Sequence, residues 1–258
     1  MGQDSKIEWT HHTFNPWIGC EKVSPACQNC YAEELNKRFR WVEWGAGKPR
    51  REANPSAWGK ALRWSKTAQD AGRRDRVFCA SLADVLDPNV PRQWLDEVLR
   101  LVQQTREGLD WLLLTKREEE LQRIPSIIRD VLGVKEGILP NLWVGVTAEN
   151  NEFWERRVPR LMDVPAVVRF VSVEPMLGPI TLGDGPVPDW IIAGGESGPR
   201  ARSLSADWVR SLRERAKGRS AFLFKQWGGV DKVAAGRVLD GEILDAYPTP
   251  RQIPVTVE

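Results

Sequence analysis

Three cysteines stand close together near the start of the chain, in the stretch GCEKVSPACQNCYAEEL. Cys20, Cys27 and Cys30 have a C-x6-C-x2-C spacing, which lets three thiolates face one inorganic centre. A [4Fe–4S] cluster held by three cysteines keeps one iron open for a further ligand. A zinc ion needs a fourth protein ligand, which His11 or His12 is placed to supply. We predict the three cysteines as metal ligands and catalytic residues, with the cluster favoured and the Cys3His zinc site as the alternative.

The remaining composition excludes several classes of protein. The chain has 258 residues, 4 Cys, 2 His and a net charge of +2. Four cysteines are too few for a disulfide-rich secreted scaffold, and Cys79, inside the apolar run VFCAS, is predicted as a core residue. MGQDSKIEWTHH lacks the pattern of a signal peptide, and no run approaches the ~20 apolar residues of a membrane span. We therefore expect a cytoplasmic protein with no membrane partner.

Seven short and nearly all-apolar runs predict strands that are buried on both faces of a parallel sheet. They cover residues 6–9, 76–82, 111–116, 141–147, 167–173, 190–193 and 221–225. Helical patterns lie between them, at residues 31–40, 92–106, 116–132, 151–162 and 205–217.

This alternation of strands and helices predicts an α/β fold. The sheet is expected to be a partial or complete TIM-barrel-like parallel sheet, with an open doubly wound sheet as the alternative. We expect residues 1–229 to form the barrel domain and residues 230–258 a C-terminal extension. Residues 39–75 interrupt the pattern as a basic, Trp-rich insertion after the first helix.

Polar residues and glycines follow the predicted strands where each strand ends. They are Ser81, Asp84, Thr115, Lys116, Thr147, Glu149, Glu174, Gly194, Gly195 and Glu196. Ligands bind at the carboxyl ends of strands in parallel sheets and barrels. Taken singly, each position is also explained as a helix cap or a surface loop. As a set, they predict one binding site.

A resemblance emerges from longer stretches of the chain. The segments IEWTHHTFNPWIGCEKVSPACQNCYAE, LLLTKR, LWVGVTAEN, RFVSVEPMLGPI, AGGESG and FKQWGG resemble a phage-protein family that a three-cysteine motif defines. That family looks similar to radical SAM enzymes and, more distantly, to spore photoproduct lyase, which repairs a thymine lesion in DNA. The lyase branch has a Ser/Asp-bearing second strand and a Thr-Lys pair ending the third. Ser81, Asp84, Thr115 and Lys116 match it here.

Two departures limit what the resemblance carries over. Most radical SAM enzymes space their cysteines C-x3-C-x2-C, with an aromatic residue before the last one. Here the first gap is six residues, and the aromatic residue is Tyr31, which follows Cys30. The Gly-Gly-Glu motif that binds the SAM amine normally ends the second strand, but here it is Gly194 to Glu196, near the sixth. We therefore expect this loop to bind a different nucleotide or the substrate.

The resemblance implies a [4Fe–4S] cluster and S-adenosylmethionine (SAM) as cofactors, which together generate a 5′-deoxyadenosyl radical. It implies that Lys116 binds the SAM carboxylate and that Ser81, Asp84 and Thr147 bind its ribose or amine. Glu149, Glu174 and Glu196 are expected to bind substrate, to relay protons, or to form salt bridges. An electron donor such as flavodoxin or ferredoxin, and a partner protein, are the further expected partners.

Basic residues gather in one segment. Residues 37–76 hold twelve Lys and Arg against four Asp and Glu, a net charge of +8, so the rest of the +2 chain carries −6. Five aromatic residues are interleaved: Phe39, Trp41, Trp44, Trp58 and Trp64. This pattern predicts contacts with phosphates and bases of DNA or RNA, or else a solvated helix pair that packs its Trp residues onto the barrel. A second basic stretch that includes Arg200, Arg202 and Arg210 is predicted as a solvated helical face.

Together these features predict a radical SAM iron–sulfur enzyme that acts on a nucleic acid, by DNA lesion repair as a lyase or by base modification. One alternative is a radical SAM enzyme with a small-molecule or peptide substrate. The other is a zinc-stabilised nucleic-acid-binding protein without catalysis.

Overall fold

The computed structural model describes residues 5–252 and is built around a seven-stranded sheet. The strands are β1 (His12–Phe14), β4 (Asp75–Cys79), β5 (Leu109–Thr115), β6 (Leu142–Thr147), β7 (Val168–Val173), β8 (Trp190–Gly194) and β9 (Ala221–Gln226). They lie side by side in chain order, and every neighbouring pair is parallel. A doubly wound sheet reverses its order at one point, and this sheet does not. The TIM-barrel-like prediction is therefore confirmed in its partial form, with β1 and β9 as the two outermost strands of the sheet.

Six of the seven predicted strands are confirmed within a few residues. The prediction of a strand at residues 6–9 is wrong, because this segment forms bends and turns and β1 begins at His12. His12 is buried, with its ring stacked on Trp64 at 4.4 Å and its Nε2 3.3 Å from Asp75 Oδ2. In the sequence His12 is a polar residue, and its burial and pairing are not visible there. β1 therefore lacks the apolar run by which the other strands were predicted.

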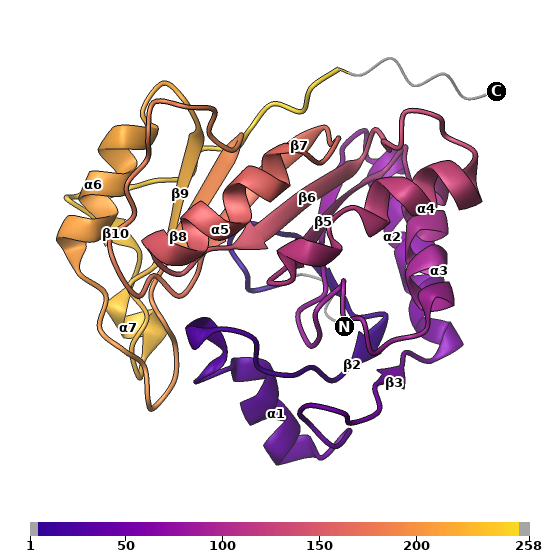
Figure 1. Cartoon of the computed structure of the whole chain (residues 1–258), viewed down its shortest axis with the longest axis horizontal. Coiled ribbons are helices and arrows are strands. Elements are labelled where there is room, and N and C mark those ends of the chain that lie inside the picture. The colour runs from indigo at the N-terminus through magenta and orange to yellow at the C-terminus, as the bar shows by residue number, and fades with distance from the viewer. Residues whose placement is uncertain (1–4, 253–258) are drawn as a thin grey trace.

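Five helices accompany the sheet: α2 (Pro55–Asp70), α3 (Arg92–Gln104), α4 (Arg123–Leu132), α5 (Asn151–Met162) and α6 (Ala206–Ala216). Figure 1 shows them along the outer side of the sheet. The helix predicted at residues 116–132 starts too early, because a short 3-10 turn (Glu118–Glu120) precedes α4. Helix α2 lies inside the segment expected as an insertion, and it connects β1 to β4 across β4 and β5. Its buried positions are mostly small, including Ala57, Ala61 and Ala68, which gave no strong apolar pattern.

The sheet separates two hydrophobic cores. The larger core lies between the strands and the outer helices. The smaller core covers the inner face and is rich in aromatic rings, among them Trp9, Phe78, Trp143, Phe170 and Trp190. Gly145 makes room for Phe170, because a Cβ at residue 145 would lie 2.5 Å from its ring. These rings fill the amino end of the inner face.

Helix α1 (Tyr31–Phe39) does not join the outer helices. In Figure 1 it lies apart from them, on the side toward which the arrow of β6 points. A two-stranded pair, β2 (Trp17–Ile18) with β3 (Arg51–Glu52), lies on the same side. The chain beyond β9 holds the short helix α7 (Lys232–Ala235) and a hairpin of β10 (Val238–Leu239) and β11 (Glu242–Ile243). In residues 5–252, none of the helices combines the length and apolarity that crossing a membrane requires.

Candidate active site

A cavity of about 650 Å³ opens at the carboxyl ends of the strands, above the inner aromatic core. A volume of this size accommodates a cofactor or small-ligand site. The cavity is lined by eleven of the residues selected from the sequence: Cys20, Cys27, Cys30, Ser81, Asp84, Thr115, Lys116, Thr147, Glu174, Gly195 and Glu196. Glu149 and Gly194 are not among the lining residues.

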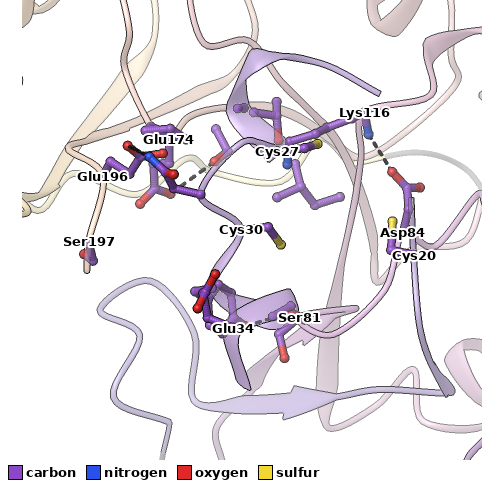
Figure 2. Close-up of a pocket in the computed structure, with 18 of the residues that line it drawn as sticks. Cys20, Cys27, Cys30, Glu34, Ser81, Asp84, Lys116, Glu174, Glu196 and Ser197 are labelled. Atoms are coloured by element: carbon purple, nitrogen blue, oxygen red, sulfur yellow. Dashed lines mark hydrogen bonds between the residues drawn. The ribbon is translucent and has the colours of Figure 1, made fainter. Parts of the chain in front are cut away.

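The three cysteines come from a single loop. It runs from the end of β2 through a short 3-10 helix (Pro25–Cys27) to Cys30, which caps the N-terminus of α1. Cys27 is buried, and Cys20 and Cys30 are partly exposed. Figure 2 shows their sulfur atoms arranged around one part of the cavity, so the loop presents all three to the same space.

Burial raises the pKa of the Cys20 thiol to about 12, and the nearby carboxylates of Asp84 and Asp87 add to this shift. Burial also raises the pKa of Cys30, although Lys116 acts against it. Only the thiolate binds metal, so metal binding by these cysteines must displace protons. The donor set therefore fits a cationic centre strong enough to compensate for the burial of the thiolates.

The two histidines lie away from the cysteines. His12 is paired with Asp75 and Trp64, and His11 Nδ1 accepts a hydrogen bond from the Arg76 backbone N–H at 2.8 Å. In the described part of the chain, no three His, Cys, Asp or Glu side chains are grouped closely enough to hold a single metal ion. Neither histidine therefore lies where a Cys3His zinc site would need it. Three cysteines are the number of protein ligands that a [4Fe–4S] cluster with one open iron takes.

Each cysteine stands next to a residue that is bound to a buried charge network. Beside Cys20, the Glu21 carboxylate accepts a hydrogen bond from Arg117 Nη2 at 3.2 Å. Arg117 is itself buried and lies at the end of β5. The start of the cysteine loop is thus held by the LLLTKR segment.

Beside Cys27, the backbone N–H of Ala26 donates to Glu149 Oε1 at 3.1 Å. The other oxygen of Glu149 accepts from Arg157 Nη1 at 3.0 Å, and Arg157 Nε donates to Glu118 at 3.2 Å. All three of these side chains are buried. The carboxylates of Glu118 and Glu149 balance the positive charge of the buried Arg157 guanidinium. The other oxygen of Glu149 accepts the hydrogen bond from the cysteine loop.

Beside Cys30, Asn29 Nδ2 donates to Glu196 Oε2 at 3.0 Å. The Glu196 carboxylate also accepts three hydrogen bonds from Arg202, from the backbone N–H and Nε at 2.9 Å and from Nη2 at 2.5 Å. Burial raises the pKa of Glu196, but the hydrogen bonds from Arg202 and Asn29 outweigh it and hold the pKa below its ordinary value. Glu196 is therefore a carboxylate that fastens the end of the cysteine loop.

The Gly-Gly pair before Glu196 permits a close approach of two loops. The backbone N–H of Gly195 donates to the Gln226 carbonyl at 2.9 Å, and a Cβ at residue 195 would lie 1.8 Å from the Trp227 carbonyl oxygen. A Cβ at Gly194 would lie 3.2 Å from Glu174 Oε1. Only glycine fits at residue 195, and this contact places Glu196 beneath the cysteine loop.

Asp84 and Thr115 join the ends of β4 and β5. Asp84 accepts from Thr115 Oγ1 at 2.6 Å, and from the backbone N–H groups of Lys116 and Leu86, each at 2.9 Å. Figure 2 marks the contact between Asp84 and Lys116. Within residues 5–252, no hydrogen-bond or ion-pair partner binds the half-buried Lys116 ammonium, which remains free to bind an anion in the cavity.

The hydroxyl groups of Ser81 and Thr147 differ in whether they have a hydrogen-bond partner. Ser81 exchanges hydrogen bonds with the Asn15 amide at 3.1 and 3.3 Å. The Thr147 hydroxyl is fully buried and has no hydrogen-bond partner among the described residues. Because a buried polar group without a partner is costly, Thr147 is a candidate position for a hydrogen bond to a ligand in the cavity.

A partly buried ion pair forms the opposite wall. Lys225 Nζ lies 2.9 Å from Glu174 Oε1, and Ser172 Oγ donates to Glu174 Oε2 at 3.1 Å. Burial lowers the pKa of Lys225, but Glu174 outweighs it and holds the pKa above its ordinary value. Lys225 is thus a protonated donor at the cavity wall.

Sequence reasoning missed several of these side chains. Lys225 is the last residue of the predicted strand 221–225 and lies within β9, so its position at a strand end was the available signal. Arg117 lies in the LLLTKR segment, but nothing in its neighbours reveals its burial. The interpretation of Arg202 as part of a solvated helical face is wrong, because α6 begins at Ala206 and Arg202 binds Glu196. Arg157 looks like any helical arginine in the sequence.

A family model described as "Protein of unknown function (DUF5131)" matches residues 4–248. The chain belongs to this family. The match includes the cysteine loop and all the strand ends described above, and it confirms the family resemblance expected from the sequence. No curated protein matches the chain.

Solved structures of spore photoproduct lyase variants are similar to this chain. One has 12% sequence identity and a TM-score of 0.48, and the match covers 84% of this chain and 64% of that one. A second, with bound AdoMet and dinucleoside spore photoproduct, has 12% identity and a TM-score of 0.48, and covers 81% and 62%. This chain thus spans less than two thirds of the length of those proteins.

Proposed function

We propose that this protein is a radical SAM enzyme in which Cys20, Cys27 and Cys30 hold a [4Fe–4S] cluster. The proposal rests on the three hydrogen bonds that attach the cysteine loop to the ends of the strands. Arg117, Glu149 and Glu196 come from three different strand ends, and each binds the residue next to one cysteine. Such preorganised support is what metal sites require around their ligands.

When bound, the cluster and SAM would supply a 5′-deoxyadenosyl radical, which abstracts a hydrogen atom from the substrate. The side chains around the cavity suit the remaining tasks. The unpaired Lys116 ammonium is a partner for the SAM carboxylate, and the Thr147 hydroxyl for a polar group of the cofactor. Trp9 and Phe78, 4.6 Å apart, form an apolar floor that keeps water from the reacting atoms.

Glu174 and Lys225 are the groups we assign to the substrate. Together they present an acceptor and a donor on one wall of the cavity, 2.9 Å apart. They are suited to hold a polar edge of a substrate or to move a proton there. An external electron donor such as flavodoxin or ferredoxin would reduce the cluster, since the chain itself offers three cysteines for one centre.

We propose a nucleic acid as the substrate, for repair or modification of a base. Support comes from the exposed part of the basic segment, which includes Lys37, Arg38 and Arg40 at the end of α1. Other parts of that segment have structural roles. Arg50 forms a buried ion pair with Asp87 at 2.7 Å, and Trp64 packs in the outer core.

Anaerobic purification tests the cofactor assignment. A brown protein with about four irons per chain supports the cluster, and incubation with SAM and dithionite should then release 5′-deoxyadenosine. Cys27→Ala should lose both iron and product, whereas Cys79→Ala should keep both, because Cys79 is buried in β4 and does not line the cavity. A colourless protein with one zinc ion per chain would overturn the proposal.

A further inference from the structure

Two aromatic rings are stacked at the far end of α1. The rings of Phe39 and Trp41 lie 5.0 Å apart at an interplanar angle of 10°. The guanidinium carbon of Arg38 lies 5.2 Å from the centre of the Phe39 ring. Phe39 is 50% exposed, and neither ring belongs to the two cores. A guanidinium and two parallel rings therefore form one surface that faces solvent.

The local backbone holds this surface in shape. Arg40 adopts a left-handed conformation with φ of 52°, which ends α1 and reverses the chain. The buried Asn36 then binds the returning chain twice, since its Nδ2 donates to the Val42 carbonyl at 2.9 Å and its Oδ1 accepts from the Val42 N–H at 3.1 Å. Trp41 lies between Arg40 and Val42 in the chain, so the turn and these two hydrogen bonds hold its ring against that of Phe39.

Helix α1 connects this surface to the cavity. Its first residues, Tyr31 and Glu34 among them, line the cavity. The nine-residue helix is about 13 Å long. Residues 37–51 hold six basic residues and one acidic residue, and of the basic ones Arg50 is buried. The exposed Phe39 and the partly exposed Trp41 thus stand in a positively charged region a short distance from the cavity.

We propose that Arg38, Phe39 and Trp41 form a stacking surface for the bases of a single-stranded nucleic acid that leads into the cavity. Exposed aromatic faces bind bases of any sequence by stacking, and neighbouring arginines bind the phosphates. The positive charge favours a polyanion over a neutral peptide or a second copy of this chain. This inference rests on the nucleic-acid substrate proposed above.

Fluorescence anisotropy with two labelled strands of equal length separates stacking from phosphate binding. One strand carries bases and the other is fully abasic. Phe39→Leu and Trp41→Leu keep apolar volume but remove a ring, so each should weaken binding of the base-bearing strand about tenfold and leave the abasic strand unchanged. Tyr247→Leu is the matched control. Its ring lies 4.2 Å under Arg76 and 5.2 Å from Trp190 at the amino end of β8, and its loss should leave both strands unaffected.

The readouts distinguish this inference from the proposed function. Iron content and SAM cleavage without substrate should be unchanged in Phe39→Leu. If the unaltered protein binds the base-bearing strand but the two Leu variants bind it equally well, the stacking surface is wrong and the nucleic-acid substrate stands. If the unaltered protein binds neither strand, both are wrong. Dimerisation that Phe39→Leu abolishes, without any loss of strand binding, would assign the surface to a second copy and overturn the inference.

Discussion

Glu149 Oε1 accepts a hydrogen bond from the backbone N–H of Ala26 at 3.1 Å, across a separation of 123 residues. Ala26 immediately precedes Cys27, and Glu149 follows β6 in a fully buried position. The contact ties the position of a thiol to the position of a strand end. A role for Glu149 in holding the cysteine loop follows from this bond, and binding to the cofactor is not needed to explain its burial.

Glu149→Ala should lower the iron content of anaerobically reconstituted protein and should destabilise the fold by about 3–5 kcal/mol, because it leaves Arg157 without one of its two buried carboxylates. Glu149→Gln should retain more iron, since it keeps an oxygen for the Ala26 N–H. Iron analysis and thermal unfolding check this. The exposed Glu152 on α5 supplies the control, and Glu152→Ala should behave like the unaltered protein. Full iron loading of a folded Glu149→Ala variant would contradict the role.

Glu196 should make stability depend on acid pH. Its pKa in the folded protein lies below the ordinary value of 4.5, so the folded state favours the ionised carboxylate. This stabilisation is complete above pH 4.5 and is lost as pH falls from there through the lowered pKa. Denaturant unfolding between pH 7 and pH 3 should show a smaller loss for Glu196→Gln than for the unaltered protein. Glu97→Gln, at an exposed position on α3, should leave the slope unchanged; an equal slope in Glu196→Gln would disprove the assignment.

Gly195→Ala should destabilise the protein by roughly 1–3 kcal/mol, the usual cost of inserting a methyl group into a closely packed contact. The added Cβ would meet the Trp227 carbonyl oxygen at 1.8 Å. It should also reduce iron retention, because Glu196 follows directly. Gly183→Ala is the matched control, since a Cβ there meets nothing within 4 Å. Equal melting temperatures of the two variants would show that the loops after β8 and β9 adjust freely.

Lys225 and Glu174 should be energetically coupled. A double-mutant cycle with Lys225→Met and Glu174→Gln should give a coupling of about 1–3 kcal/mol, because either single change leaves a charge unpaired in a partly buried site. The exposed pair Lys217 and Glu214, 4.0 Å apart with side chains more than three quarters exposed, provides the comparison. Its coupling should be below about 0.5 kcal/mol. Similar values for the two cycles would show that water screens the cavity pair.

Much of the fold was predictable because its information is local. Runs such as WLLLT and LWVGVT are apolar over a whole strand, and the amphipathic helices between them required parallel neighbours. The two elements that were not predicted lack such a local signal. His12 is polar but buried in β1, and the alanines of α2 bury little area each. Both elements exist because of contacts with distant residues, which no short window of sequence contains.

The candidate site divides in the same way. The sequence alone determined that three cysteines share one loop and that polar residues end successive strands, so both sets had to meet at one edge of a parallel sheet. Only the tertiary structure decided which carboxylates face the cavity and which hold the cysteine loop. Glu149 and Glu174 are both glutamates that follow a strand of the parallel sheet. Glu149 nevertheless binds Ala26 and Arg157, whereas Glu174 lines the cavity beside Lys225. The physical reason is that a carboxylate takes its role from the donors packed around it, and those donors come from positions far apart in the chain.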